Sequence, residues 1–322
     1  MQYRLFGRTK IQVSEIGHGT WTMGSRWGAR DDRTAIDSLV ASIDLGVNFI
    51  DTAFVYGHGH SEGLIASALK LRPKKEIFIA TKVPPKNHQW PAQHAVPVEE
   101  SFTKKHIIEY TEKSLKNLRR DFIDLQQLHV WNDTWLGHGD FLEGIEKLKQ
   151  EGKIRFFGVS LNDHQPNSAL QIVASGLIDS VQVIYNIFDQ TPETKLFPVC
   201  QKHNVAVIAR VPFDEGSLTG TLTPQTIFHP KDWRKTYFTP ERLPEVCQKV
   251  NKLTFLVRDE IKTLSQAALK FCLSHPQVSL VIPGMKKINH VKENCAASDG
   301  KILTGEELEK IKTHAWNRNF YN

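Results

Sequence analysis

Four side chains that can perform acid–base chemistry stand at or just beyond short apolar runs of this sequence. Asp51 and Tyr56 follow "VNFI", Lys82 follows "IFIAT" and His129 follows "FIDLQQL". Burying an unpaired ammonium is costly, so Lys82 needs an anionic partner, and Asp51 is the natural one. A positive charge favours phenolate, so Lys82 is expected to lower the Tyr56 pKa. The sequence predicts Tyr56 as a general acid and His129 as the group that orients a substrate carbonyl.

The elements that must position these residues are short β-rich runs bounded by Gly, Asn or Asp. Eight such runs begin near residues 14, 47, 77, 122, 154, 180, 205 and 279. Helical patterns lie between them, at residues 33–46, 61–70, 140–152 and 166–176. Asp31 or Asp32 is expected to cap the first of these helices and Ser61 the second, while Thr304 to Glu307 has the spacing of a capping box.

Eight apolar runs alternating with helices predict a parallel sheet covered by helices. Units of about 25 to 35 residues favour a closed (β/α)8 TIM barrel, which we expect to be one domain over residues 1–322. Residues 3–14 are expected to form an N-terminal β-hairpin, and residues 84–102 and 212–243 long loops after strands 3 and 7. The alternative is a doubly wound open sheet, but no GxGxxG follows the first run.

In a barrel, the carboxyl ends of all strands meet at one mouth, so the four reactive side chains should gather there. A metal site is the remote alternative, because His18, His58, His60 and His129 are near the same mouth and "HGH" resembles a zinc-binding pair. No carboxylate or further His ends the later strands to complete such a site. The sequence therefore favours no metal, and a metal-dependent hydrolase stays the less favoured function.

The composition narrows the class of protein. The chain has 322 residues, a net charge of +6 and 24% charged residues, without a dense Lys/Arg run, which argues against nucleic-acid binding. No apolar run approaches ~18 residues, so no membrane contact and a cytoplasmic location are expected. The four cysteines are scattered without a CxxC pair, which indicates reduced thiols. A modest positive surplus suits a polyphosphate cofactor.

The segments "FIDTAFVYGHGHSE", "FIATKV", "DLQQLH", "FFGVS" and "VQVIYN" together resemble the aldo-keto reductases, in order and spacing over essentially the whole chain. The resemblance implies a (β/α)8 barrel that reduces aldehydes and ketones with NADP(H), or NAD(H) as the second choice. The family's catalytic tetrad falls on Asp51, Tyr56, Lys82 and His129. "GSLTGTL" and "VIPGMKKINHVKEN" are similar to the microbial and potassium-channel-beta-like branch. That branch adds an alternative function, a weakly catalytic NADP(H)-binding redox-sensing or interaction subunit.

The resemblance also implies a cofactor site. Ser160 and Gln182 match the residues that hold the nicotinamide carboxamide, Leu161 stands where Asn is frequent with Asn162 one position on, and Arg210 matches the residue over the nicotinamide. The loop around the pyrophosphate matches Pro212, Phe213, Gly216, Ser217, Leu218 and Gly220. The adenosine end matches Gly284, Lys286, His290, Glu293 and Asn294, with Lys286 toward a 2′-phosphate.

Aromatic residues are expected to line the pocket for a small-molecule carbonyl substrate. The candidates are Trp21, Phe54, Trp90 and Trp131. Packing in the core or at the rim is the alternative for each of them.

Overall fold

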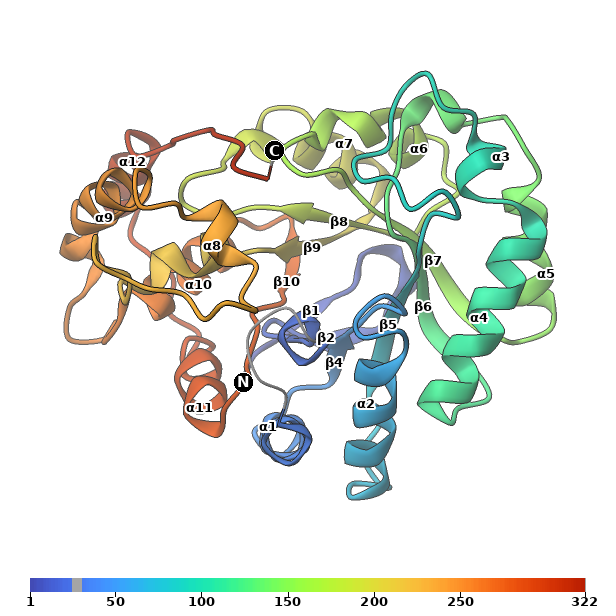
Figure 1. The fold of residues 1–322 in the computed structure, drawn as a ribbon, viewed down its shortest axis with the longest axis horizontal. Helices are drawn as coiled ribbons and strands as arrows, with labels where there is room; N and C mark the ends of the chain where they lie inside the picture. The colour runs from blue at the N-terminus through green and yellow to red at the C-terminus, as the bar shows by residue number, and fades with distance from the viewer. Residues whose placement is uncertain (25–30, 322) are drawn as a thin grey trace.

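The computed structural model describes residues 1–24 and 31–321. Its strands are β1 (Tyr3–Leu5), β2 (Gln12–Ser14), β3 (His18–Gly19), β4 (Phe49–Asp51), β5 (Phe78–Val83), β6 (Ile123–Leu128), β7 (Ile154–Ser160), β8 (Ser180–Ile184), β9 (Ala206–Arg210) and β10 (Val278–Val281). Its helices are α1 (Asp32–Asp44), α2 (His60–Lys70), α3 (Val98–Ser101), α4 (Lys104–Leu118), α5 (Phe141–Gln150), α6 (Leu170–Ala174), α7 (Leu196–His203), α8 (Arg234–Tyr237), α9 (Leu243–Asn251), α10 (Leu264–Ser274), α11 (Ile288–Ala296) and α12 (Gly305–Lys312). Figure 1 shows the helices arranged around the sheet.

The sheet closes on itself. Strands β3 to β10 lie side by side in chain order, and each neighbouring pair is parallel. Parallel bridges from Ile16 to Val281 and from Gly19 to Gly284 join the two edges. The predicted (β/α)8 barrel is confirmed, and the open doubly wound sheet is wrong.

The predicted N-terminal hairpin is also present, as the antiparallel pair β1 and β2. Phe6 follows β1 and is fully buried, with its ring 5.7 Å from that of Phe49 and 5.4 Å from that of Phe78. These two residues begin β4 and β5. The hairpin therefore closes the end of the barrel opposite the carboxyl ends of its strands.

The barrel interior changes from apolar to polar toward the mouth. Successive strand side chains alternate between faces, so residues two positions apart share a face. A buried apolar layer contains Phe49, Phe78, Ala80, Leu125, Ala206, Ile208, Leu280 and Ile282. The next residues on the same faces are polar, and they include Asp51, Lys82, Gln127 and Arg210. Ser160 and Gln182 pair in register beside them. A polar ring thus lies above the apolar layer.

Two helix caps expected from the sequence are present. The Asp31 carboxylate accepts a hydrogen bond from the Thr34 N–H at 3.0 Å and caps α1, and Thr304 forms the predicted capping box with Glu307. The prediction that Ser61 caps α2 is wrong, because α2 begins at His60 after Gly59. The Ser61 hydroxyl instead donates to the Thr20 hydroxyl at 2.8 Å.

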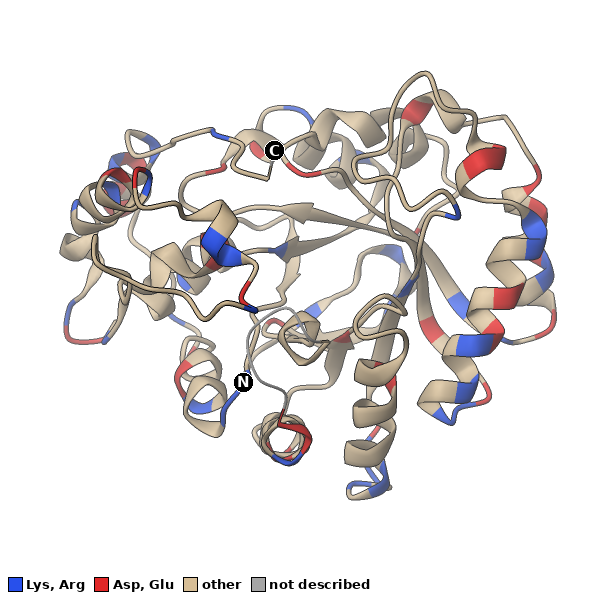
Figure 2. Cartoon of the chain, in the orientation of Figure 1, with Lys and Arg blue, Asp and Glu red and all other residues tan. Residues whose placement is uncertain are grey.

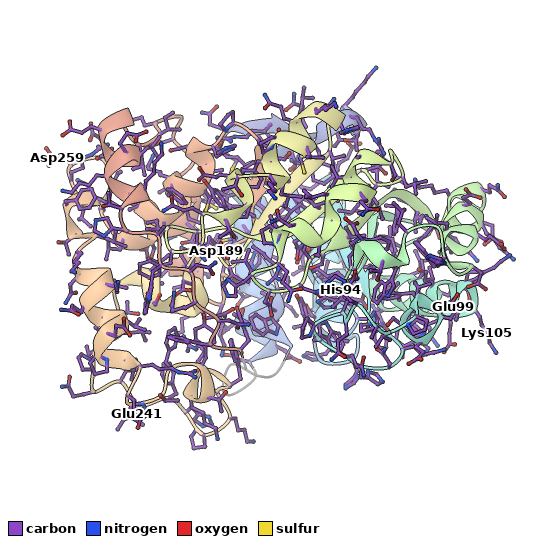
Figure 3. The ribbon with its side chains drawn as sticks, turned by 90° about the horizontal axis from the view of Figure 1, so that it is seen from above. His94, Glu99, Lys105, Asp189, Glu241 and Asp259 are labelled. Atoms are coloured by element: carbon purple, nitrogen blue, oxygen red, sulfur yellow. The ribbon has the colours of Figure 1, made fainter. Side chains whose placement is uncertain are left out.

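Two long connections follow β5 and β9, as predicted. Residues 84–103 contain the short helix α3, and residues 211–263 contain α8 and α9, so the second connection is not simply a loop. In Figure 3 the first connection, marked by His94 and Glu99, and the second, marked by Glu241, lie on either side of Asp189. They flank the segments that follow β7 and β8.

Charge lies mainly on the outer helices, whereas most of the strand ribbon in Figure 2 is uncharged. All four cysteines are buried and none is in a disulfide. No helix in residues 1–24 and 31–321 combines the length and apolarity needed to cross a membrane.

Candidate active site

A buried ion pair links β4 and β5. The Lys82 Nζ lies 2.7 Å from Asp51 Oδ1 and donates to the Thr52 carbonyl at 2.9 Å, with 0% and 4% of the Lys82 and Asp51 side chains exposed. Asp51 Oδ2 accepts from the Gln182 amide at 2.8 Å. Both carboxylate oxygens are therefore bonded, as a buried charge requires.

Tyr56 and His129 lie against this pair. The Lys82 Nζ is 5.3 Å from the centre of the Tyr56 ring, and the rings of Tyr56 and His129 are 5.9 Å apart at 74°. His129 follows β6, whose last residue, Leu128, pairs with Val83 at the end of β5. The structure thus brings together all four side chains singled out in the sequence.

The protonation of this group differs from the expectation. Burial raises the pKa of Tyr56, and the Asp51 carboxylate raises it further, while the Arg210 charge opposes them. The predicted lowering of the Tyr56 pKa is wrong, because desolvation of a phenolate outweighs the nearby cations. Burial lowers the pKa of Lys82, against the effect of Asp51. Burial, Lys82 and Arg210 hold the pKa of His129 well below its usual value. At neutral pH the phenol keeps its proton and the imidazole is uncharged.

The residues expected at the nicotinamide end belong to the same polar ring. Ser160 is buried at the end of β7, and Gln182 donates to Asp51. The Arg210 Nη2 donates to the Leu161 carbonyl at 2.9 Å and to Asp163 Oδ1 at 2.6 Å. The Arg210 Nε is buried without a hydrogen-bond partner in the described part of the chain. Arg210 is thus fixed through Nη2, while its buried Nε is left to bond a ligand.

Asn162 has a structural role that the sequence did not predict. Its Oδ1 accepts from the Ala92 N–H at 2.9 Å, and its Nδ2 donates to the Ala92 carbonyl at 3.1 Å and to Gln165 Oε1 at 3.0 Å. These bonds fasten the connection after β5 to the loop after β7. The Asn162 Oδ1 can accept one more hydrogen bond, so its contact with the cofactor stays a prediction. Leu161, 2% exposed and apolar, offers no amide at the preceding position.

The loop expected around the pyrophosphate has an unusual backbone. Gly216 and Gly220 have φ of 106° and 73°, which glycine adopts without strain. A Cβ built on Gly216 would lie 3.1 Å from Arg234 Nη1. Pro212, Ser217 and Leu218 are buried, and Phe213 is half-buried. Sequence reasoning missed the two buried acids of this loop, Asp214 and Glu215. The sequence did contain a signal for Asp214 and Glu215, because two acidic residues are unexpected in a loop assigned to an anionic pyrophosphate.

The residues expected at the adenosine end lie beyond β10 and on α11. Asn294 is 3% exposed, and its buried Nδ2 has no partner among residues 1–24 and 31–321. Glu293 accepts from the Thr263 hydroxyl at 2.6 Å, and His290 is exposed. Lys286 and Gly284 lie in the turn between β10 and α11.

The residues present fit a dinucleotide. The orphaned donors Arg210 Nε and Asn294 Nδ2 lie in the segments assigned to its two ends, and His129 Nδ1 is a third buried polar atom with no partner in the described chain. Buried polar atoms are normally hydrogen-bonded, so unpaired ones at these positions favour a bound ligand.

The four aromatic candidates differ in position. Trp90 is 45% exposed and lies edge-on to His129 at 5.8 Å, and Trp21 is half-buried 5.3 Å from Trp233. Phe54 is half-buried and packs against Tyr110 of α4 at 4.8 Å, so its place in the pocket stays a prediction. The expectation for Trp131 needs correction, because Trp131 is fully buried against Trp135. Trp131 belongs to the core because the apolar side chains around it leave none of its surface exposed.

The histidines considered for a metal site do not converge. His18 is bonded to Ser42 at 3.0 Å, His60 to Asp32 at 2.8 Å, and His58 is exposed. Within the described residues, no three His, Cys, Asp or Glu side chains are placed to hold a metal ion.

Comparison with known proteins agrees with this arrangement. Residues 15–315 match the aldo/keto reductase family. The aldo-keto reductase YhdN of Bacillus subtilis is 31% identical over 320 residues, covering 97% of this chain and 93% of that protein. A probable voltage-gated potassium channel subunit beta of Oryza sativa subsp. japonica is 28% identical, covering 97% of this chain and 96% of that one. An aldo-keto reductase of Klebsiella pneumoniae, solved in complex with NADPH, has a TM-score of 0.70 at 28% identity, covering 99% and 98% of the two chains. The chain belongs to the aldo/keto reductase family, whose members are NAD(P)H-dependent oxidoreductases.

Proposed function

We propose that this chain, acting as a single domain over residues 1–322, reduces a small-molecule aldehyde or ketone to an alcohol with NADPH. The observation that carries the proposal is the convergence of Tyr56, His129 and the Lys82–Asp51 pair at the carboxyl ends of β4, β5 and β6. In this proposal a proton donor, a neutral hydrogen-bond donor and a buried cation lie around one point.

Tyr56 is the proposed general acid. Its hydroxyl keeps its proton until negative charge develops on the substrate oxygen, because burial disfavours the phenolate. When bound, the nicotinamide supplies a hydride to the carbonyl carbon. Tyr56 then gives its proton to the oxygen, and the Lys82 ammonium, 5.3 Å from the ring centre, stabilises the phenolate that remains.

His129 and Asp51 position these groups. The uncharged imidazole of His129 donates a hydrogen bond to the carbonyl oxygen and does not compete with Tyr56 for the role of acid. Asp51 holds Lys82 at 2.7 Å and keeps the ammonium charged despite its burial.

The proposed cofactor contacts follow the geometry. Ser160 and Gln182 hold the nicotinamide end, and Arg210, fixed by Asp163, presents its guanidinium plane there. The loop from Pro212 to Gly220 surrounds the pyrophosphate, and Lys286 favours NADP(H) over NAD(H). The proposed substrate enters past Trp90 and Trp21, and the proposed location is the cytoplasm.

The experiment is an NADPH-consumption screen over aldehydes, ketones and sugars, at matched concentrations of the wild type and of Tyr56→Phe. We expect at least one carbonyl to be turned over by the wild type and to be nearly inert with the variant. Tight NADPH binding without turnover of any carbonyl would instead favour the weakly catalytic interaction subunit.

A further inference from the structure

The loop proposed to surround the pyrophosphate carries two consecutive acidic residues. Asp214 and Glu215 are 2% and 5% exposed, so both carboxyls lie inside the protein. A pyrophosphate is anionic, so a carboxylate close to it repels it, and the repulsion is stronger in the protein interior than in water. Unneutralised carboxylates here would oppose cofactor binding.

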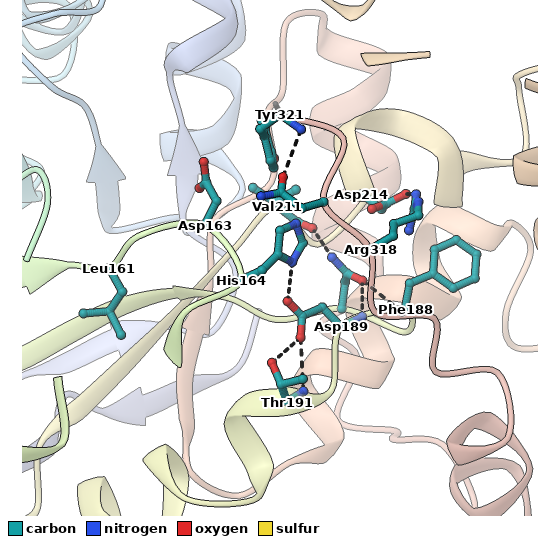
Figure 4. Close-up of polar contacts among 12 residues, drawn as sticks. Leu161, Asp163, His164, Phe188, Asp189, Thr191, Val211, Asp214, Arg318 and Tyr321 are labelled. Carbon is teal, nitrogen blue, oxygen red and sulfur yellow. Dashed lines mark hydrogen bonds and ion pairs between the residues drawn. The ribbon is translucent and has the colours of Figure 1, made fainter. Parts of the chain in front are cut away.

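The C-terminal segment, residues 316–321, supplies a partner for each acid. The Arg318 Nη2 forms an ion pair with Asp214 Oδ2, with 8% and 3% of the two side chains exposed. The Tyr321 hydroxyl donates to Glu215 Oε1. Figure 4 shows Arg318 beside Asp214, with Tyr321 on the other side of Val211. Segments about 100 residues apart in sequence are thereby joined at the loop.

Independent contacts hold this segment in place. The Tyr321 ring stacks on Trp233 at 5.9 Å with an interplanar angle of 9°. The backbone N–H of Trp316 donates to the Phe188 carbonyl at 2.8 Å, and the Arg318 guanidinium lies 3.9 Å from the centre of the Trp316 ring. The Arg318 guanidinium is therefore held between the Trp316 ring and Asp214, and its charge lies beside the Asp214 carboxylate.

From these contacts we infer that Arg318 is a positioning residue for the cofactor: by neutralising Asp214 it lets the loop at residues 211–220 accept a pyrophosphate. The inference rests on the proposed function, because the loop's ligand comes from it. Arg318 acts through Asp214.

The other charged groups around the loop leave Asp214 as the carboxylate that Arg318 neutralises. Arg210 lies at the end of β9 paired with Asp163, and Arg234 lies over Gly216. Burial raises the pKa of Glu215 to about 8, against the effect of the Tyr321 hydrogen bond, and Asp214 raises it further. Glu215 is thus mainly neutral at pH 7, which leaves Asp214 as the acid that needs a cation.

The test uses the full chain and measures the dissociation constant of NADPH by quenching of tryptophan fluorescence. We expect Arg318→Met to weaken binding by about tenfold, because Asp214 is left as an uncompensated anion. We expect Asp214→Asn to bind NADPH at least as tightly as the wild type, because an anion has been removed. If the pair only holds the loop in shape, both variants should weaken binding together, and that result would overturn the inference.

The double variant Arg318→Met/Asp214→Asn distinguishes a loss of charge balance from a loss of folding. Arg318→Met leaves a buried charge and lowers stability, so binding is measured well below its melting temperature. Recovery of near-wild-type affinity in the double variant supports charge neutralisation, and no recovery contradicts it. Arg258→Met is the control, since Arg258 pairs with Glu307 at 2.8 Å and with Glu260, and within the described residues none of its ion pairs reaches residues 211–220. A wild type that does not bind NADPH would refute the proposed function itself, whereas equal affinities of wild type and Arg318→Met refute only the inference.

Discussion

Gln182 donates a hydrogen bond to Asp51 at 2.8 Å, across the barrel from β8 to β4. The same carboxylate holds Lys82 at 2.7 Å through its other oxygen. A residue proposed to touch the nicotinamide is therefore coupled, through one carboxylate, to the cation beside the proposed general acid. If Gln182 rotated toward a ligand, Asp51 would keep its ion pair with Lys82 and its hydrogen bond from the Gln127 amide, which lies 3.5 Å from Oδ2.

Tyr56→Phe removes the proposed proton donor and keeps the ring against Lys82. We expect kcat to fall by about 10² to 10⁴, the usual contribution of a general acid. NADPH affinity should stay within about twofold, because the hydroxyl is not proposed to contact the cofactor. Steady-state kinetics and a fluorescence titration measure the two quantities. Unchanged kcat would refute the mechanism.

Lys82→Met leaves the Asp51 carboxylate buried without its ammonium. Breaking a buried pair on one side costs about 3–5 kcal/mol of the free energy of unfolding. Lys82→Met/Asp51→Asn removes both charges and should recover much of this loss, while activity stays low in both variants. Urea denaturation of the three proteins gives the comparison. Equal stabilities of the single and double variants would mean that the pair is not energetically coupled.

Asn162→Ala removes the amide that fastens the connection after β5 to the loop after β7. The Ala92 N–H and carbonyl then lose their partners, at a cost of about 1–3 kcal/mol. Trp90 lies in the same connection, so we expect KM for the carbonyl substrate to rise more than the dissociation constant of NADPH. Weaker NADPH binding at an unchanged KM would instead support a contact of Asn162 with the cofactor.

Glu215 makes stability depend on pH. Its folded pKa of about 8 lies above the ordinary carboxyl value of 4.5, so between these pH values the folded chain holds a proton that the unfolded chain releases. The stability from this proton is complete below about pH 4.5 and is lost as the pH rises toward 8, by roughly 1.4 kcal/mol per unit within that window. Glu215→Gln should therefore flatten the decline between about pH 5 and pH 8. Urea denaturation of both proteins across this range measures it, and parallel curves would contradict the assignment.

Lys286→Ala tests the choice of cofactor. If Lys286 meets a 2′-phosphate, the variant should lose about tenfold in NADPH affinity, since a charge-assisted contact contributes roughly 1.5 kcal/mol, and little in NADH affinity. The ratio of the two dissociation constants is the measurement. An unchanged ratio would remove Lys286 from the cofactor site.

The barrel and the main features of its mouth were predictable from short stretches of sequence. Each strand shows its own apolar pattern, and the succession of strands and helices along the chain indicates the barrel. Asp51, Lys82 and Arg210 each stand two positions beyond an inward apolar residue, and parallel strands bring such positions to one end. The Lys82–Asp51 pair followed from the cost of burying a lone ammonium.

The errors came from long-range packing. The Tyr56 pKa depends on how much protein surrounds the phenol, which no local pattern records. The structural role of Asn162 was missed because its partner, Ala92, lies 70 residues away in a connection whose path the sequence does not define. Trp131 packs in the core, the alternative that the sequence left open, because the surrounding segments enclose it.

The N-terminal hairpin and Tyr321 lie at opposite ends of the barrel. The N-terminal hairpin covers the closed base at Phe49 and Phe78, whereas Tyr321, the last residue described, bonds to a loop at the open mouth. An affinity tag or fusion partner is therefore best attached ahead of Met1. A partner joined beyond Tyr321 is expected to lie close to the loop at residues 211–220 and to weaken cofactor binding.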